Sequence, residues 1–93
     1  MNYDKFVTRM WKKPLTFSIE LYLTTAFCGE AGEVANAVKK LVRDCATKEE
    51  VDLQNELGDC LYYLTALAHY YEWTLQDIMQ ANIEKLESRH KER

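Results

Sequence analysis

Apolar residues recur along most of this chain at intervals of three and four positions, which is the spacing of one face of an α-helix. The clearest example occupies the second half of the chain and comprises Leu53, Leu57, Cys60, Leu61, Leu64, Leu67 and Tyr71. A shorter stripe in the middle comprises Val34, Val38, Leu41 and Val42. No segment reads convincingly as a strand. The pattern therefore predicts an all-α fold.

Four helices follow from this periodicity and its interruptions. The helices are predicted at about residues 3–12, 16–44, 48–70 and 75–89. Residues 90–93 are expected to fray at the end of the last helix. Pro14 separates the first two helices, because proline disfavours helical backbone in the residue before it. Thr47 with Glu50, and Thr74 with Asp77, have the spacing of a capping box that opens a helix. Since the connections are short, successive long helices should be antiparallel neighbours in a small bundle.

Length and composition indicate one globular domain, 1–93. The chain has 93 residues, of which 47% are hydrophobic and 29% are charged. A chain of this size buries only about 60–65% of its unfolded surface. We therefore expect oligomerisation, as a homodimer or homotetramer, to complete the bundle.

Charge, hydropathy and cysteine content exclude several classes of protein. A net charge of -3 provides no general attraction to a nucleic acid polymer or an anionic membrane. The chain has no apolar stretch of membrane-spanning length and no signal-peptide pattern at its start, so a cytoplasmic location is expected. Its three cysteines are odd in number and lack a CxxC spacing, which argues against a disulfide framework and a zinc site.

All three glycines lie beside one of two acidic pairs, in segments that otherwise read as helix interior. These segments are Gly29-Glu30-Ala31-Gly32-Glu33 and Glu56-Leu57-Gly58-Asp59. A glycine inside a helix costs about 1 kcal/mol relative to alanine. The glycines therefore indicate that another helix, or a ligand, approaches the backbone closely beside the four carboxylates.

The two acidic pairs should meet at one level of the bundle. Each pair has i,i+3 spacing and so projects from one helix face. Both pairs lie roughly 15–23 Å from the predicted turn near Cys45, at ~1.5 Å per residue. Neighbouring carboxylates ~5 Å apart would repel by about 3 kcal/mol per pair at an effective dielectric of ~20, so the arrangement requires a cation. Glu30, Glu33, Glu56 and Asp59 offer only oxygen, which favours Mg²⁺, with Mn²⁺ as a substitute.

The last helix offers complementary charge. Asn82, Lys85 and Arg89 share one face of it. If this helix folds back from a turn near Trp73, these side chains reach the level of the acidic pairs. Cations beside a metal-binding carboxylate cluster suit a polyphosphate ligand. Lys40, on the same side of its helix as Glu33, adds a further positive charge.

Simpler interpretations stand beside this one. Chance alone predicts about two acidic pairs at i,i+3 spacing in a chain with this many acids. A cationic helix face is often only solvated surface. The same residues would therefore also suit a non-catalytic helical oligomerisation or binding module. A di-iron or di-manganese bundle is disfavoured, because Glu-x-x-His occurs once, at Glu87 and His90. Aromatic residues are usually packing residues, but Trp11 is a candidate for contact with a nucleotide base.

The motifs resemble a known family. The segments that carry the resemblance are Gly29-Glu30-Ala31-Gly32-Glu33-Val34, Lys39-Lys40, Glu56-Leu57-Gly58-Asp59-Cys60-Leu61-Tyr62-Tyr63 and Asn82-Ile83-Glu84-Lys85-Leu86-Glu87-Ser88-Arg89. They are similar to the MazG-like nucleoside triphosphate pyrophosphohydrolases of the all-α NTP pyrophosphatase superfamily. The resemblance covers about residues 26–89. Phe27-Cys28 and His90 depart from the usual pattern, outside the proposed chemistry.

This resemblance implies a reaction and a set of roles. The reaction is hydrolysis of a nucleoside triphosphate between the α and β phosphates, which yields the monophosphate and pyrophosphate. The implied magnesium-binding carboxylates are Glu30, Glu33, Glu56 and Asp59, and the implied groups near the phosphates are Asn82, Lys85 and Arg89. Either Glu30 or Glu33 would act as the base that activates water. The family also implies dimers or tetramers with sites near subunit contacts.

Overall fold

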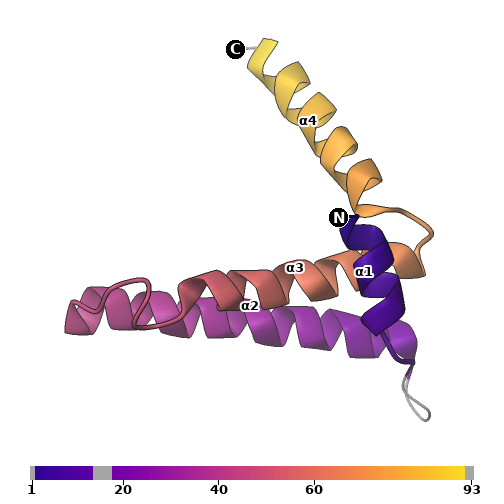
Figure 1. Cartoon of the computed structure of the whole chain (residues 1–93). Coiled ribbons are helices and arrows are strands. Elements are labelled where there is room, and N and C mark those ends of the chain that lie inside the picture. Colours follow the sequence, from indigo (N-terminus) through magenta and orange to yellow (C-terminus); the bar gives the residue numbers. More distant parts are fainter. Residues whose placement is uncertain (1, 14–17, 92–93) are drawn as a thin grey trace.

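Two long antiparallel helices form the body of the structure. A computed structural model describes residues 2–13 and 18–91, and the helices in those ranges are α1 (Tyr3–Met10), α2 (Ile19–Asp44), α3 (Leu53–Tyr70) and α4 (Leu75–Lys91). α2 and α3 lie side by side as a hairpin, and α1 crosses this hairpin near the end opposite the α2–α3 connection (Figure 1). No strand occurs in the described ranges, which confirms the all-α prediction.

The connection between α2 and α3 corrects one predicted boundary. The capping box does form, because Thr47 N donates to Glu50 Oε1 at 3.2 Å and Glu50 N donates to Thr47 Oγ1 at 3.1 Å. It closes only a turn, however, since Asp52 adopts left-handed backbone with φ 54°. α3 therefore begins at Leu53 and not at Lys48. The second box, between Thr74 and Asp77, opens α4 as predicted.

The other helix ends lie close to their predicted places. α1 ends at Met10, two residues before its predicted end, because the next residue, Trp11, has extended backbone. The predicted start of α2, Thr16, lies outside the described residues; α2 begins after Ser18, whose Oγ accepts a hydrogen bond from Leu21 N. α4 continues through His90 and Lys91, so the expected fraying of these two residues was wrong. Residues 92–93 lie outside the described part.

A small core lies where α1 crosses the hairpin. Its buried centre is Val7, Leu23 and Ala66, and the residues packed around it are Tyr3, Phe6, Trp11, Ile19, Tyr62, Tyr63 and Leu67. Towards the α2–α3 connection the apolar stripes stay open, since Val42 is 79% exposed and Leu57 is 53% exposed. One copy of the chain therefore covers only part of the apolar surface that the periodicity marks.

α4 does not complete a bundle within the chain. It leaves the end of α3 and points away from the hairpin (Figure 1), and none of its residues is buried. The expectation that α4 folds back along α3 was wrong for the single chain. The turn before α4 explains its direction, because Glu72 adopts left-handed backbone with φ 67° and Asp4 of α1 accepts a hydrogen bond from Leu75 N at 2.7 Å.

None of the helices in the described ranges combines the length and the apolar character that a membrane-spanning helix needs.

Candidate functional site

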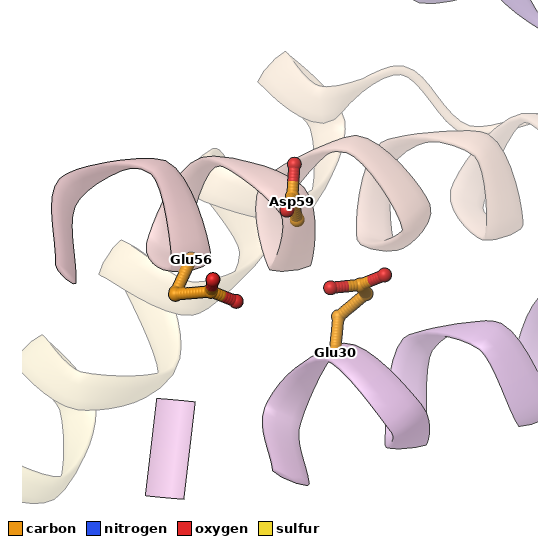
Figure 2. A group of neighbouring side chains, drawn as sticks. All are labelled: Glu30, Glu56 and Asp59. Carbon is orange, nitrogen blue, oxygen red and sulfur yellow. The ribbon is translucent and has the colours of Figure 1, made fainter. Parts of the chain in front are cut away.

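Three of the four predicted metal ligands converge between α2 and α3. One carboxylate oxygen from each of Glu30, Glu56 and Asp59 lies within 4.8 Å of the corresponding oxygens of the other two. Glu30 reaches from α2 toward the two acids of α3, which stand one turn apart (Figure 2). The antiparallel hairpin creates this group, which we call the acidic triad, because it places the two i,i+3 pairs at matching heights.

The negative charges of the triad's carboxylates repel one another. Partial burial raises the pKa of Glu30, and the charges of Asp59, Glu56 and Glu33 raise it further. The ion pairs in the described part of the chain are Arg43–Asp44 and His69–Asp4, so neither neutralises the triad. A divalent ion would relieve this repulsion. Because every donor is a carboxylate oxygen, the triad fits a hard ion rather than a thiolate-binding or imidazole-binding metal.

Glu33 stands apart from the triad. It lies one turn beyond Glu30 on α2 and is exposed, whereas Glu30 and Glu56 are half-buried. Its charge nevertheless acts on Glu30. The structure thus places Glu33 beside the triad, close enough for electrostatic influence, but does not bring it into the same group of oxygens.

Lys40 and Trp11 occupy different parts of the molecule. Lys40 is exposed on α2. The hydrogen bond from Arg43 lowers the pKa of Asp44, and the charge of Lys40 lowers it further. Trp11 follows α1 and packs against Tyr22, with 5.7 Å between the ring centroids. Tyr22 is on α2, two turns before Glu30.

The cationic face of α4 is not brought to the triad within one chain. Asn82, Lys85 and Arg89 are all exposed on α4, and α4 points away from the hairpin (Figure 1). The predicted convergence of positive and negative groups at one height was therefore wrong for the single copy. The sequence places these residues on one helix face, but it does not reveal the direction in which that helix leaves the turn.

Cys60 and Tyr63 neighbour the triad, although the sequence analysis did not include them among the candidate site residues. Burial raises the pKa of the Cys60 thiol, with further contributions from Glu30, Asp59 and Glu56. Burial likewise raises the pKa of Tyr63, followed by Tyr22 and, more weakly, Tyr62 and Glu30. Extending the i,i+4 spacing from Asp59 would have indicated Tyr63, because that position lies on the same side of α3.

The glycines beside the triad face open space. A Cβ atom added to Gly29, Gly32 or Gly58 would meet no heavy atom within 4 Å. Of the two explanations predicted for the glycines, a helix or a ligand, close packing by a helix of the same copy is therefore excluded. Since all three glycines also have ordinary helical backbone without positive φ, no feature inside one copy requires them. What remains is close approach by a ligand or by another copy.

Comparison with known proteins supports a common family. The model of the MazG nucleotide pyrophosphohydrolase domain matches residues 18–93, which include α2, α3, α4 and the triad and leave out α1. "Gene 37 protein" of Mycobacterium phage L5 is 43% identical over 72 residues, which cover 73% of this chain. The match spans 63% of that relative's length. No solved structure gives a significant match. Given the family match over α2 to α4, this chain belongs to the MazG nucleotide pyrophosphohydrolase domain family.

Proposed function

We propose that this protein is a metal-dependent nucleoside triphosphate pyrophosphohydrolase, which cleaves the substrate between the α and β phosphates. The observation that carries the proposal is the acidic triad, in which carboxylates from two helices approach within 4.8 Å in a chain of this family. The products are a nucleoside monophosphate and pyrophosphate.

The triad is the proposed metal site. Glu30, Glu56 and Asp59 would hold Mg²⁺, or Mn²⁺ as a substitute, through carboxylate oxygens. When bound, the ion supplies positive charge that binds the phosphates and makes the α-phosphorus more electrophilic. Partial burial of Glu30 and Glu56 strengthens these interactions, because charges act over a lower effective dielectric there than in bulk water.

Glu33 is the proposed general base, with Glu30 the alternative. Because Glu33 lies beside the triad and outside it, its carboxylate remains free to accept a proton from the attacking water. The water oxygen then bonds to the α-phosphorus, the bond from the α-phosphorus to the bridging oxygen breaks, and pyrophosphate leaves with that oxygen.

The remaining predicted residues are proposed substrate contacts. Lys85 and Arg89, with Asn82, would neutralise non-bridging phosphate oxygens as charge moves onto the leaving group. Lys40 would add positive charge on the α2 side. Trp11, which packs on Tyr22 at the other end of α2 from Lys40, would contact the base.

Amide substitutions in the triad test this function directly. Glu56→Gln and Asp59→Asn should each lower the Mg²⁺-dependent rate by about 100-fold or more, since loss of one group that stabilises transition-state charge costs 10²–10³. Monophosphate and pyrophosphate are measured separately, and circular dichroism checks that the helices persist. Full activity in either variant would contradict the proposal, and so would inorganic phosphate as the first product.

The exposed apolar side chains favour a second candidate, a non-catalytic helical interaction module. Met79, Ile83 and Leu86 on α4 are 44%, 49% and 52% exposed, as expected of a helix that binds a partner. Calorimetry with Mg²⁺ separates the two functions. We expect the ion to bind and to raise the unfolding temperature; absence of binding, together with absence of turnover, would leave the interaction module.

A further inference from the structure

We infer that the cavity between α1 and the α3–α4 turn binds a nucleoside monophosphate, with the base on Trp73 and the phosphate on Lys5 and Arg9. The inference goes beyond the proposed function, because none of these residues belongs to the triad or to the proposed substrate contacts. His69, which also lines the cavity, lies about 15 Å along α3 from Asp59, at ~1.5 Å per residue. The cavity is therefore a separate, second site.

Two segments that are far apart in the sequence form the walls of this cavity. Its volume is about 490 Å³, within the range of roughly 300–1,000 Å³ that small-molecule pockets occupy. The model of the MazG domain begins at residue 18, so the α1 wall lies outside the part of the chain that the family shares. The walls include Lys5, Thr8 and Arg9 of α1 and Glu72, Trp73 and Thr74 of the turn.

Hydrogen bonds at Asp4 hold the two walls together. Asp4 Oδ1 accepts from His69 Nε2 at 2.6 Å and from Leu75 N at 2.7 Å. The side chains of Asp4 and His69 are only 21% and 23% exposed. The walls are thus fixed before a ligand arrives, which reduces the ordering that binding requires. Because the Asp4 carboxylate already interacts with these donors, its charge opposes an anionic ligand less than that of a free carboxylate would.

Trp73 provides an aromatic surface in the cavity. Its side chain is 53% exposed, and its ring lies 6.1 Å from the ring of Tyr71 at an interplanar angle of 38°. The Tyr71 hydroxyl in turn donates a hydrogen bond to Glu20 of α2. The indole is therefore supported on one side and open on the other. Nucleic acid bases stack on such aromatic faces whatever their sequence identity, so this surface favours a planar aromatic ligand.

Lys5 and Arg9 provide positive charge beside the indole. They are one turn apart on α1, so they share one helix face. Neither belongs to an ion pair in the described part of the chain. The Arg9 guanidinium lies over the Phe6 ring, 5.7 Å from its centroid, an arrangement that positions the group without using its N–H donors. Two positive charges match the charge of about −2 that a phosphate monoester carries at neutral pH.

The remaining polar groups of the cavity suit a nucleoside with a single phosphate. The Glu72 carboxylate would repel a longer phosphate chain, but it can accept hydrogen bonds from sugar hydroxyls or from the amino group of a base. Thr74 Oγ1 accepts a hydrogen bond from Asp77 N at 3.1 Å, which leaves its hydroxyl hydrogen able to donate to the ligand. The ligand is thus of the class that the proposed reaction releases.

The fluorescence of Trp73 tests this inference at the site itself. The chain has two tryptophans, so Trp11→Phe leaves Trp73 as the only one, and Glu56→Gln with EDTA suppresses binding at the triad. The monophosphates of adenosine, guanosine, cytidine and uridine are titrated, and calorimetry on Glu56→Gln alone checks the affinity without the Trp11 change. At least one should bind saturably and quench Trp73. Absence of binding by all four would overturn the inference.

Two partial ligands show whether both halves of the site contribute. The unphosphorylated nucleoside and inorganic phosphate should each compete at least about tenfold more weakly than the monophosphate, since each lacks either the charged hydrogen bonds or the stacking. A nucleoside that binds as tightly as its monophosphate would contradict the role of Lys5 and Arg9. Inorganic phosphate that binds as tightly would contradict the role of Trp73. Either result would overturn the inference.

Arg9→Gln and Lys48→Gln form a matched pair of variants. Each removes one exposed positive charge, but Lys48 lies in the α2–α3 connection, at the other end of the hairpin. Arg9→Gln should weaken binding at least about tenfold, and Lys48→Gln should leave it unchanged. Unchanged binding in Arg9→Gln, or equal weakening in both, would overturn the inference. Because no turnover is measured, an inactive enzyme would contradict the proposed function without affecting this result.

Discussion

The Asp4 carboxylate connects parts of the chain that are far apart in sequence. It accepts a hydrogen bond from His69, 65 residues away, and from the backbone of Leu75, 71 residues away. Burial alone would raise the pKa of Asp4, but hydrogen bonds from Leu75 and His69, the His69 charge and a further bond from Gln76 leave the pKa below its ordinary value. Asp4 therefore stabilises the folded chain in its ionised form.

Asp4→Asn should lower the stability of the chain at neutral pH by about 1 kcal/mol, because the amide keeps an acceptor oxygen but loses the negative charge that strengthens the hydrogen bonds from Leu75 and His69. A lowered pKa in the folded state gives a stabilisation that is present in full above the ordinary value of 3.8 and is lost as the pH falls below it. The difference in unfolding temperature between wild type and variant should therefore narrow below about pH 4. Thermal unfolding followed by circular dichroism across pH measures this difference.

Glu87→Gln provides the control at this scale. Glu87 is an exposed carboxylate on α4 itself, so its replacement removes the same charge without affecting the hydrogen bonds that Asp4 accepts from Leu75 and His69. The unfolding temperature should stay close to wild type at every pH. Equal destabilisation by both variants would mean that the net charge of the chain, and not the charged hydrogen bonds of Asp4 with Leu75 and His69, explains the effect of Asp4.

At the scale of single helices, the glycines of α2 show where local propensity and function diverge. Gly29 has helical backbone, and a Cβ atom there meets nothing within 4 Å. Alanine would therefore fit without strain and would favour the helix. The presence of glycine at this position, next to Glu30, is explained if substrate or a second copy approaches the backbone.

Gly29→Ala should raise the free energy of unfolding by about 0.5–1 kcal/mol. We also expect it to lower pyrophosphohydrolase activity at least tenfold, because the added methyl group obstructs the approach to the triad. Urea unfolding and steady-state kinetics measure the two effects separately. The control, Ala35→Gly on the same helix, should lower stability and leave kcat/KM unchanged. A stabilised Gly29→Ala variant with full activity would leave the glycine without a functional explanation.

Helix boundaries also illustrate this intermediate scale. The two capping boxes were readable from the sequence, and both sets of hydrogen bonds form. Only the box at Thr74 opens a helix. The turn that begins at Thr47 does not continue into α3, because Asp52 between them has left-handed backbone. A capping box specifies a turn through local hydrogen bonds, whereas continuation into a helix depends on the residues and packing that follow.

At the scale of the whole molecule, the chain has more apolar surface than it covers. The core around Val7, Leu23 and Ala66 is confined to the crossing of α1 over the hairpin, and α4 has no buried residue. If copies of the chain associate, as its small size leads us to expect, this apolar surface becomes part of the interface. Assembly and catalysis would then depend on the same residues.

Ile83→Lys tests this dependence. A charge in the apolar face of α4 should convert the expected homo-oligomer to a monomer, because a lysine charge is costly to bury in an apolar interface. Activity should fall as well if assembly completes the site. Light scattering measures the mass. The control Ser88→Lys places the same charge on the opposite side of α4 from Met79, Ile83 and Leu86, and it should leave both assembly and activity unchanged. An active, monomeric Ile83→Lys variant would show that one chain suffices.

The sequence by itself determined the helices, the two acidic pairs and their approximate heights, since these depend on spacing along one helix and on short connections. It also placed Glu30, Glu56 and Asp59 together. Only the tertiary structure decided that Glu33 stands outside that group, that Asp4 binds the start of α4 and that α4 leaves the hairpin. These features depend on turn backbone angles and on contacts between distant residues, which a periodic pattern does not encode.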